Sequence, residues 1–307
     1  MPWIYYDDVF LTHDTGHHPE CADRLRVIHE HLLKVGLWDA NLRPTKRDAT
    51  VEEIALVHTP EHIERVRALS AEGGAFDADT ALSKGSYAAA VRAVGAVLEA
   101  CDSVLGGKTR SAFCAVRPPG HHAMPNRAMG FCLFNNVAIA ARYLEKKHGL
   151  KRIAIVDWDV HHGNGTQAAL NTDPCTFFLS LQRFPFWPGS GASDEKGEGP
   201  GKGLKLNIPL PYNTSREHYL SSFQYALEGP VADFKPQFIL ISAGFDTYKD
   251  DPIGGLNLDV EDFGRLTQIV AKVAQTHCGG KIVSSLEGGY NLQGLPLCVE
   301  QHFRALP

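Results

Sequence analysis

The stretch that most constrains the fold runs from Lys151 to Gln167, KRIAIVDWDVHHGNGTQ. After Lys151 and Arg152 come four apolar residues, 153–156, a pattern typical of a central parallel strand covered on both faces. The run then ends in Asp157, Asp159 and His161. Buried carboxylates need a partner, and strand alternation lets Asp159 and His161 face the same cation. A metal site is therefore one interpretation, and an acidic loop before a capped helix is the other.

Strand-like and helix-like segments alternate along the rest of the chain. This order predicts an α/β fold of three layers (αβα) with a mostly parallel central sheet, formed by one domain over residues 1–307. The expected strands are 3–6, 111–116, 153–156, 176–181, 204–208, 238–242 and 281–286. The expected helices are 22–35, 51–57, 60–69, 87–100, 135–148, 166–170, 216–234 (broken near Gly229 and Pro230) and 260–277, and 183–203 is the longest irregular stretch.

Four of the apolar strands run directly into polar, glycine-rich motifs. The motifs contain His121-His122, Asp157 to His161, Asp246, and Gly288-Gly289-Tyr290. Each has a structural explanation on its own, namely a packing pair, a helix cap or a core aromatic residue. In an open parallel sheet, however, all four strand ends lie on the rim where ligands bind. The four motifs together favour one active site.

The residue types on this rim indicate metal-assisted amide hydrolysis. Asp159, His161 and Asp246 supply three ligands and leave positions open, as in a catalytic site. Zinc suits this set, and the two oxygen ligands would also accept Fe²⁺. The other expected roles are general acid and base for His121 and His122, orientation of these histidines by Asp157 and Asn164, and donation to a tetrahedral oxyanion by Tyr290.

Composition narrows the class of protein further. The formal net charge is −5 and no Lys/Arg cluster is prominent, which argues against direct nucleic-acid binding. The first residues lack the pattern of a secretory signal, and no apolar run reaches transmembrane length. The seven cysteines are scattered, which is typical of reduced thiols. A cytoplasmic protein without membrane contact is expected.

Five motifs resemble those of the zinc-dependent histone deacetylase superfamily, which shares the arginase-like α/β fold. They are RPPGHHA (117–123), GFCLFNN (130–136), DWDVHHGNGTQ (157–167), SAGFD (242–246) and LEGGY (286–290). Residues 161–167 and 188–191 resemble the class II branch, with its bacterial members and the acetylpolyamine amidohydrolases. The resemblance implies the metal and catalytic roles given above, with Asp157 partnering His121 and Asn164 partnering His122.

The resemblance also implies a substrate tunnel and structural cations. The tunnel residues are Gly130, Phe131, Trp187, Ile253 and Gly289, with Asp79 as the rim acid and Asp77 as its alternative. A structural potassium ion is implied near Asp157, Asp159, His161, Ser180 and Leu181, and a second such site near Leu170, Asp173 and Thr176. Four positions depart from relatives. Asn164 stands where class I members carry Asp, and Gln182 stands where many relatives have His. Trp187 stands where the tunnel wall is usually Phe, and Ile253 stands where a polyamine-selective relative carries Glu.

The expected activity is removal of acetyl, or another short acyl group, from an acylated lysine of a protein or peptide. An acetylpolyamine amidohydrolase, acting on a small acylated amine, is the alternative. An arginase-like enzyme with two manganese ions needs a further Asp where this chain has Gly163. A catalytically inactive acyl-binding protein is a fourth hypothesis. Such a protein should have lost Tyr290, a histidine or a metal ligand, and none of these residues is missing. The sequence carries no prediction of the oligomeric state.

Overall fold

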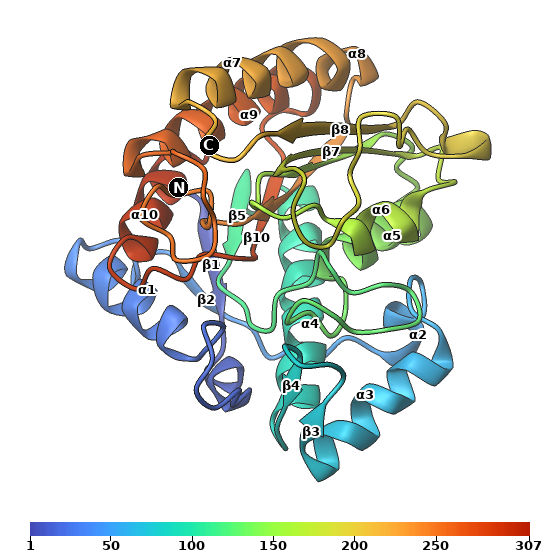
Figure 1. Cartoon of the computed structure of the whole chain (residues 1–307), viewed down its shortest axis with the longest axis vertical. Helices are drawn as coiled ribbons and strands as arrows, with labels where there is room; N and C mark the ends of the chain where they lie inside the picture. Colours follow the sequence, from blue (N-terminus) through green and yellow to red (C-terminus); the bar gives the residue numbers. More distant parts are fainter.

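A computed structural model describes residues 1–307, and its centre is a sheet of eight strands that all run parallel (Figure 1). The strands lie in the order β2-β1-β5-β10-β9-β6-β7-β8. Their bounds are β1 (Trp3–Tyr6), β2 (Leu42–Pro44), β5 (Ser111–Cys114), β6 (Ile153–Asp157), β7 (Thr176–Arg183), β8 (Lys205–Leu210), β9 (Phe238–Ala243) and β10 (Ile282–Leu286).

Helices cover both faces of this sheet. Helices α4 (Ser86–Leu105) and α5 (Asn136–His148) pack against one face. Helices α9 (Val260–Cys278), α10 (Leu295–Ala305) and α1 (Asp23–Lys34) form a connected layer on the other side in Figure 1. The predicted three-layer α/β fold is confirmed. The other helices are α2 (Val51–Ile54), α3 (Pro60–Glu72), α6 (Asn164–Leu170), α7 (Arg216–Ala226), α8 (Ala232–Phe234) and the 3₁₀ helices η1 (Asp8–Thr12) and η2 (Gly199–Gly201). A separate hairpin consists of β3 (Gly74–Ala75) and β4 (Ala81–Leu82).

The strands that carry the polar motifs are neighbours in the sheet. In the order β5-β10-β9-β6, Ser285 of β10 lies between Cys114 and Ser242, and Ser242 in turn pairs with Asp157. Every residue of these four strands is buried, because helices cover both sides. Their carboxyl ends therefore bring four distant parts of the chain to one place on the rim.

Two elements of the structure were not predicted, and two predicted helices differ from it. Helix α10 and the edge strand β2 were not among the expected elements, because α10 carries the buried polar residue His302 and β2 has only three residues. The helix expected over 216–234 does not break at Pro230. A single π-helical turn, Leu227–Val231, accommodates the proline and connects α7 to α8. The helix expected over 51–57 ends already at Ile54.

The two ends of the chain lie close together, as Figure 1 shows. Thr109 Oγ1 donates to the carbonyl of Met1, and Ser111 Oγ donates to that of Pro307, so both ends meet at the start of β5. No helix combines the length and the apolar character needed to cross a membrane.

A buried cluster of ion pairs holds the chain segment that follows β10. The Glu20 carboxylate accepts hydrogen bonds from Arg117 at 2.5 and 2.8 Å and from Arg24 at 3.2 Å, and all three side chains are fully buried. Arg24 also donates to the carbonyls of Glu287 and Gly289, at the end of β10. Burial alone would raise the pKa of Glu20, but Arg117 and Arg24 outweigh it and hold the pKa at about 2.

We predict that Glu20→Gln lowers the free energy of unfolding by about 3–5 kcal/mol, since it leaves two buried guanidinium groups without a counter-charge. Urea denaturation measures this loss. Because the pKa of Glu20 is depressed from 4.5 to about 2, its contribution is complete above pH 4.5 and disappears as the pH falls toward 2.

Glu64→Gln is the matched control, because Glu64 is exposed and pairs with the exposed Arg67 on the same helix. Its cost should stay below about 1 kcal/mol. Equal losses in the two variants would contradict the structural importance of the buried cluster.

Candidate active site

Two carboxylates and one imidazole converge where β6 and β9 end. His161 Nδ1 lies 3.0 Å from Asp159 Oδ1 and 3.3 Å from Asp246 Oδ2. One ligand atom from each of the three residues lies within 4.8 Å of the others, and all three residues are buried. The contact with Asp246 lacks hydrogen-bond geometry, so Asp246 Oδ2 is a buried oxygen without a donor. A donor set of this kind fits one divalent cation.

Backbone amides hold these carboxylates in place. Val160 N donates to Asp246 Oδ1 at 2.8 Å, and Gly288 N donates to Asp159 Oδ2 at 2.9 Å. Burial lowers the pKa of His161, but Asp159 and Asp246 outweigh it and raise the pKa to about 9. Burial and the charge of Asp159 raise the pKa of Asp246 to about 7. Both shifts have one physical meaning, namely that this cluster favours positive charge at its centre.

The paired histidines have different partners. His121 Nδ1 lies 3.0 Å from Asp157 Oδ2, and His122 Nδ1 lies 2.7 Å from Asn164 Oδ1. Burial opposes charge on both rings, but Asp159 and Asp157 raise the pKa of His121 well above its usual value. The pKa of His122 is lowered by burial and by the neighbouring His121 and His161. Two adjacent imidazoles are thus biased toward opposite protonation states, the arrangement needed for an acid and a base.

A cavity of about 400 Å³ leads to these groups. Phe131 packs edge-on against Tyr290, with ring centroids 5.8 Å apart, and Ile253 also lines the cavity. Gly130 has φ +57°, and a Cβ there would lie 2.5 Å from Trp187 and 2.6 Å from His122. Only glycine permits this close approach. The lining residues are Asp77, Ala78, Asp79, His122, Met129, Gly130, Phe131, His161, Phe186, Trp187, Ile253 and Tyr290.

Two further aromatic rings, Phe186 and Trp187, line the cavity together with Phe131. Trp187 packs edge-on against His122 at 4.6 Å and is 44% exposed, which places it toward the mouth. Phe186 stacks on His161, with centroids 5.1 Å apart and the planes within 17°. Its other neighbour is the Arg183 guanidinium, 3.9 Å from the ring centroid. The sequence motifs did not identify Phe186, although it immediately precedes Trp187.

Not all of the predicted substrate-binding residues line the cavity. Both Asp77 and Asp79 line the cavity and are exposed, so the structure does not separate these alternatives. His18 Nε2 lies 3.1 Å from the Asp79 carbonyl, and its ring packs on Phe131, so it supports this side of the cavity. Gly289 is not among the lining residues. Its carbonyl accepts from Arg24 at 2.7 Å, which makes it part of the support behind Tyr290.

Sequence reasoning missed the two residues that fix Tyr290. The Asp251 carboxylate accepts from the backbone amides of Tyr290 at 2.7 Å and of Ile253 at 2.9 Å. The Arg24 guanidinium lies 5.1 Å from the centre of the Tyr290 ring. Neither has a recognisable motif, because their partners are distant in sequence or are backbone groups.

The residues implied for a structural potassium ion lie beside this cluster. Asp157 on β6 pairs with Ser180 on β7, followed by Leu181. The Ser180 hydroxyl is buried and has no hydrogen-bond partner, although neutral buried hydroxyl groups are normally satisfied. An oxygen in this state, next to a buried carboxylate, fits a cation ligand.

Gly163 leaves no space for a second set of acidic ligands. A Cβ at this position would lie 2.3 Å from Asp157 Oδ2 and 3.1 Å from the Phe178 ring. The additional aspartate of a two-manganese centre would collide with both groups. The arrangement therefore favours a single transition-metal ion.

Comparison with known proteins agrees with this geometry. A family model described as "Histone deacetylase domain" matches residues 18–306. A probable deacetylase of Archaeoglobus fulgidus is 38% identical over 296 residues, which cover 95% of this chain and 82% of that protein. Polyamine deacetylase HDAC10 of Homo sapiens is also 38% identical; the match covers 95% of this chain but 46% of that protein.

A solved structure is similar over almost the whole chain. The crystal structure of the HDA15 HD domain superimposes with a TM-score of 0.93 at 35% sequence identity and covers 99% of this chain and 87% of that one. Because both the sequence match and the fold extend over nearly all residues, this protein belongs to the histone deacetylase family.

Proposed function

We propose that this chain is a zinc-dependent amidohydrolase that removes acetyl, or another short acyl group, from acylated lysine in proteins or peptides. The observation that carries the proposal is the position of Asp159, His161 and Asp246, beside two histidines with different partners, at a cavity with aromatic walls. A cavity lined by Phe131 and Phe186 suits the aliphatic part of an acyl-lysine side chain.

We assign the metal to Asp159, His161 and Asp246, with zinc as the preferred ion and Fe²⁺ as a second that this donor set would accept. When bound, the ion polarises the amide carbonyl and makes an attacking water more acidic. The buried, donor-free Asp246 Oδ2 and the raised pKa of His161 support this assignment, since both indicate a place that favours a cation.

The partners of the two histidines support different roles. Asn164 is neutral, so it orients His122 without stabilising its charged form; with Nδ1 donating to Asn164, Nε2 is free to accept a proton from water. Asp157 is a carboxylate and stabilises a charged His121. We assign His122 as the base and His121 as the charged neighbour that favours delivery of a proton to the leaving amine as the C–N bond breaks.

Tyr290 is proposed to donate a hydrogen bond to the oxyanion of the tetrahedral intermediate. Its ring is held between Phe131 and Arg24, and its backbone amide is fixed by Asp251. Burial raises the pKa of Tyr290 well above its usual value, so the phenol keeps the proton it must donate. A donor fixed before the reaction stabilises the transition state without reorganisation.

A structural potassium ion is proposed at Asp157, Asp159, His161, Ser180 and Leu181. The unpartnered Ser180 hydroxyl supports it. An ion there would balance the buried charge of Asp157, the partner of His121.

A small acylated polyamine is the second candidate substrate. Asp77 and Asp79 are the only charged residues among those lining the cavity, apart from its histidines, and an acidic mouth attracts a cationic ligand. Ile253 argues against strong polyamine selection, because an aliphatic side chain at the mouth offers no counter-charge.

Comparing turnover of acetyl-lysine peptides and acetylated spermidine separates the two substrates. We expect a higher kcat/KM for the peptide with the zinc-loaded enzyme. Exclusive use of acetylated spermidine would replace the lysine assignment by the polyamine one, and no turnover of any acylated amine would contradict the proposed function itself.

Tyr290→Phe should retain zinc and lower kcat by about 10²–10³-fold, because it removes one donor to the oxyanion. The measurement pairs steady-state kinetics with metal content. Tyr248→Phe is the control, since its hydroxyl bonds to Asp250 at the surface, and it should keep its activity. Unchanged turnover in Tyr290→Phe would remove the tyrosine from the mechanism.

Asp246→Asn should lose most of the bound zinc after incubation with one equivalent of zinc and dialysis, because a neutral amide is a poor ligand for this ion. Elemental analysis measures the content. Asp250→Asn changes an exposed carboxylate four residues away and should leave the zinc content unchanged. Full zinc content in Asp246→Asn would show that the ligand set is wrong.

A further inference from the structure

Lys205, the first residue of β8, is a buried lysine that no proposed catalytic step uses. It is 1% exposed. Its Nζ donates to the carbonyl of Thr176 at 2.9 Å and to that of Asp173 at 3.4 Å. Burial lowers the pKa of Lys205 to about 8, which leaves the amine mostly charged at neutral pH. A buried ammonium is costly unless its surroundings supply oxygen atoms, as they do here.

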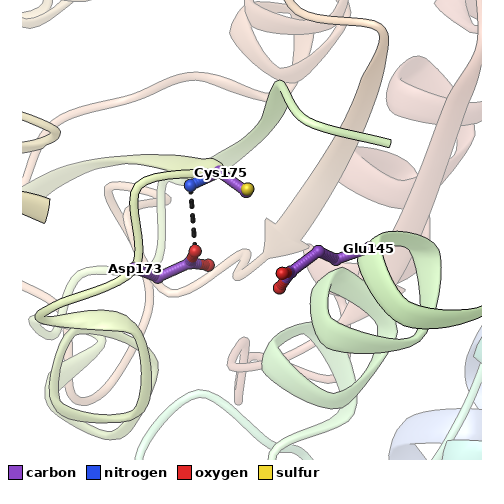
Figure 2. Close-up of side chains that lie close together, drawn as sticks. All are labelled: Glu145, Asp173 and Cys175. Carbon is purple, nitrogen blue, oxygen red and sulfur yellow. Dashed lines mark hydrogen bonds between the residues drawn. The ribbon is translucent and has the colours of Figure 1, made fainter. Parts of the chain in front are cut away.

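The nearby Glu145, Asp173 and Cys175 could be taken for a metal site, since their ligand atoms lie within 4.8 Å of one another. Figure 2 shows Glu145 on helix α5, with its carboxylate directed toward Asp173 and Cys175. The Asp173 carboxylate already accepts from Cys175 N at 2.9 Å and from Thr176 Oγ1 at 2.7 Å. Burial also raises the pKa of the Cys175 thiol, which opposes the thiolate form that binds metals.

The positive charge near Glu145 and Asp173 is supplied by two side chains of the protein, Arg142 and Lys205. Arg142 NH1 lies 3.0 Å from Glu145 Oε2 and 3.3 Å from Asp173 Oδ1. The Lys205 ammonium donates to the backbone carbonyls of Asp173 and Thr176. Two acidic side chains thus meet two basic ones. No charge remains for a bound metal ion to balance.

The same residues disagree with the second structural cation that the family resemblance implied near Leu170, Asp173 and Thr176. A monovalent ion binds through carbonyl oxygens, and the carbonyls of Asp173 and Thr176 are directed at Lys205 Nζ. An alkylammonium group and a potassium ion carry the same charge and are of similar size. The residues of this chain therefore do not fit a bound ion at this position.

We propose that the Lys205 ammonium replaces the second monovalent cation, so that this chain fixes the connection between α6 and β7 with a covalently attached charge. The connection matters for the site because α6 begins at Asn164, the partner of His122, and β7 carries Ser180. This inference does not depend on the proposed deacetylase activity, since cation binding and stability test it.

Lys205→Ser should create a binding site for a potassium ion in place of the lysine ammonium. The short serine side chain leaves the carbonyls of Asp173 and Thr176 facing an open space. We expect its Tm to lie below that of the wild-type protein in choline chloride. At constant ionic strength, 150 mM KCl should then raise it by about 3–6 °C more than it raises the wild-type Tm. Lys205→Ser should also bind one more thallium(I) ion per chain, measured by equilibrium dialysis.

Lys205→Met is the matched control, since it keeps a long side chain in the same space and removes the charge. It should be destabilised and gain neither a potassium response nor a thallium ion. An equal gain in Lys205→Met, or no gain in Lys205→Ser, would overturn the proposal.

A measurement on the wild-type protein covers the case in which Lys205→Ser does not fold. With ¹⁵N-lysine labelling, the Lys205 ammonium should give a protected signal that is the same in choline and in potassium chloride. Loss of the protected signal in potassium chloride would show that potassium displaces the lysine ammonium, and the proposal would fail.

Discussion

The repulsion between two buried carboxylates, Asp159 and Asp246, is the constraint on which the active-site rim depends. Both follow the ends of parallel strands and are held by backbone amides. His161 is drawn between them and its pKa is raised to about 9. Such a cluster is stable only with a positive charge among its oxygens. The sheet order β5-β10-β9-β6 keeps the carboxylates together despite their repulsion, because β9 and β6 are neighbours joined by a parallel ladder of backbone hydrogen bonds.

Two other buried acids, Glu20 and Asp173, are neutralised by basic side chains of the chain itself. Glu20 has Arg117 and Arg24, and Asp173 has Arg142 beside its carboxylate. The Asp159 and Asp246 pair has no lysine or arginine among its hydrogen-bond or ion-pair partners. This contrast is a physical reason to place an exogenous cation at the rim and nowhere near Asp173, even though simple proximity of ligand atoms marks both places alike.

Much of the fold was predictable because its determinants are local. The apolar runs of β6, β9 and β10 and the polar residues directly after them are contiguous in sequence, and parallel pairing brings them together. Phe186, Arg24, Asp251 and Lys205 were not predictable in the same way. Their roles arise from contacts with backbone groups or with residues far along the chain, such as Arg24 with Gly289. Helix α10 shows the opposite case: its buried residues Leu295, Cys298, Val299, His302 and Phe303 do have helical spacing, but a buried histidine makes the pattern look less apolar.

The two cation positions differ in what they require, and this explains why a lysine suits only one of them. The carbonyls of Asp173 and Thr176 need a charge with hydrogen-bond donors, which an ammonium group supplies without leaving. In the proposed mechanism, the rim holds an ion that can also accept an electron pair from a substrate oxygen, and an ammonium group has no orbital for that interaction. A lysine ammonium in the place of the proposed metal ion, beside His161, would neutralise Asp159 and Asp246 but could not activate a substrate. A lysine can therefore replace a cation that only stabilises the fold, whereas the proposed metal site between Asp159 and Asp246 requires an ion with open coordination positions.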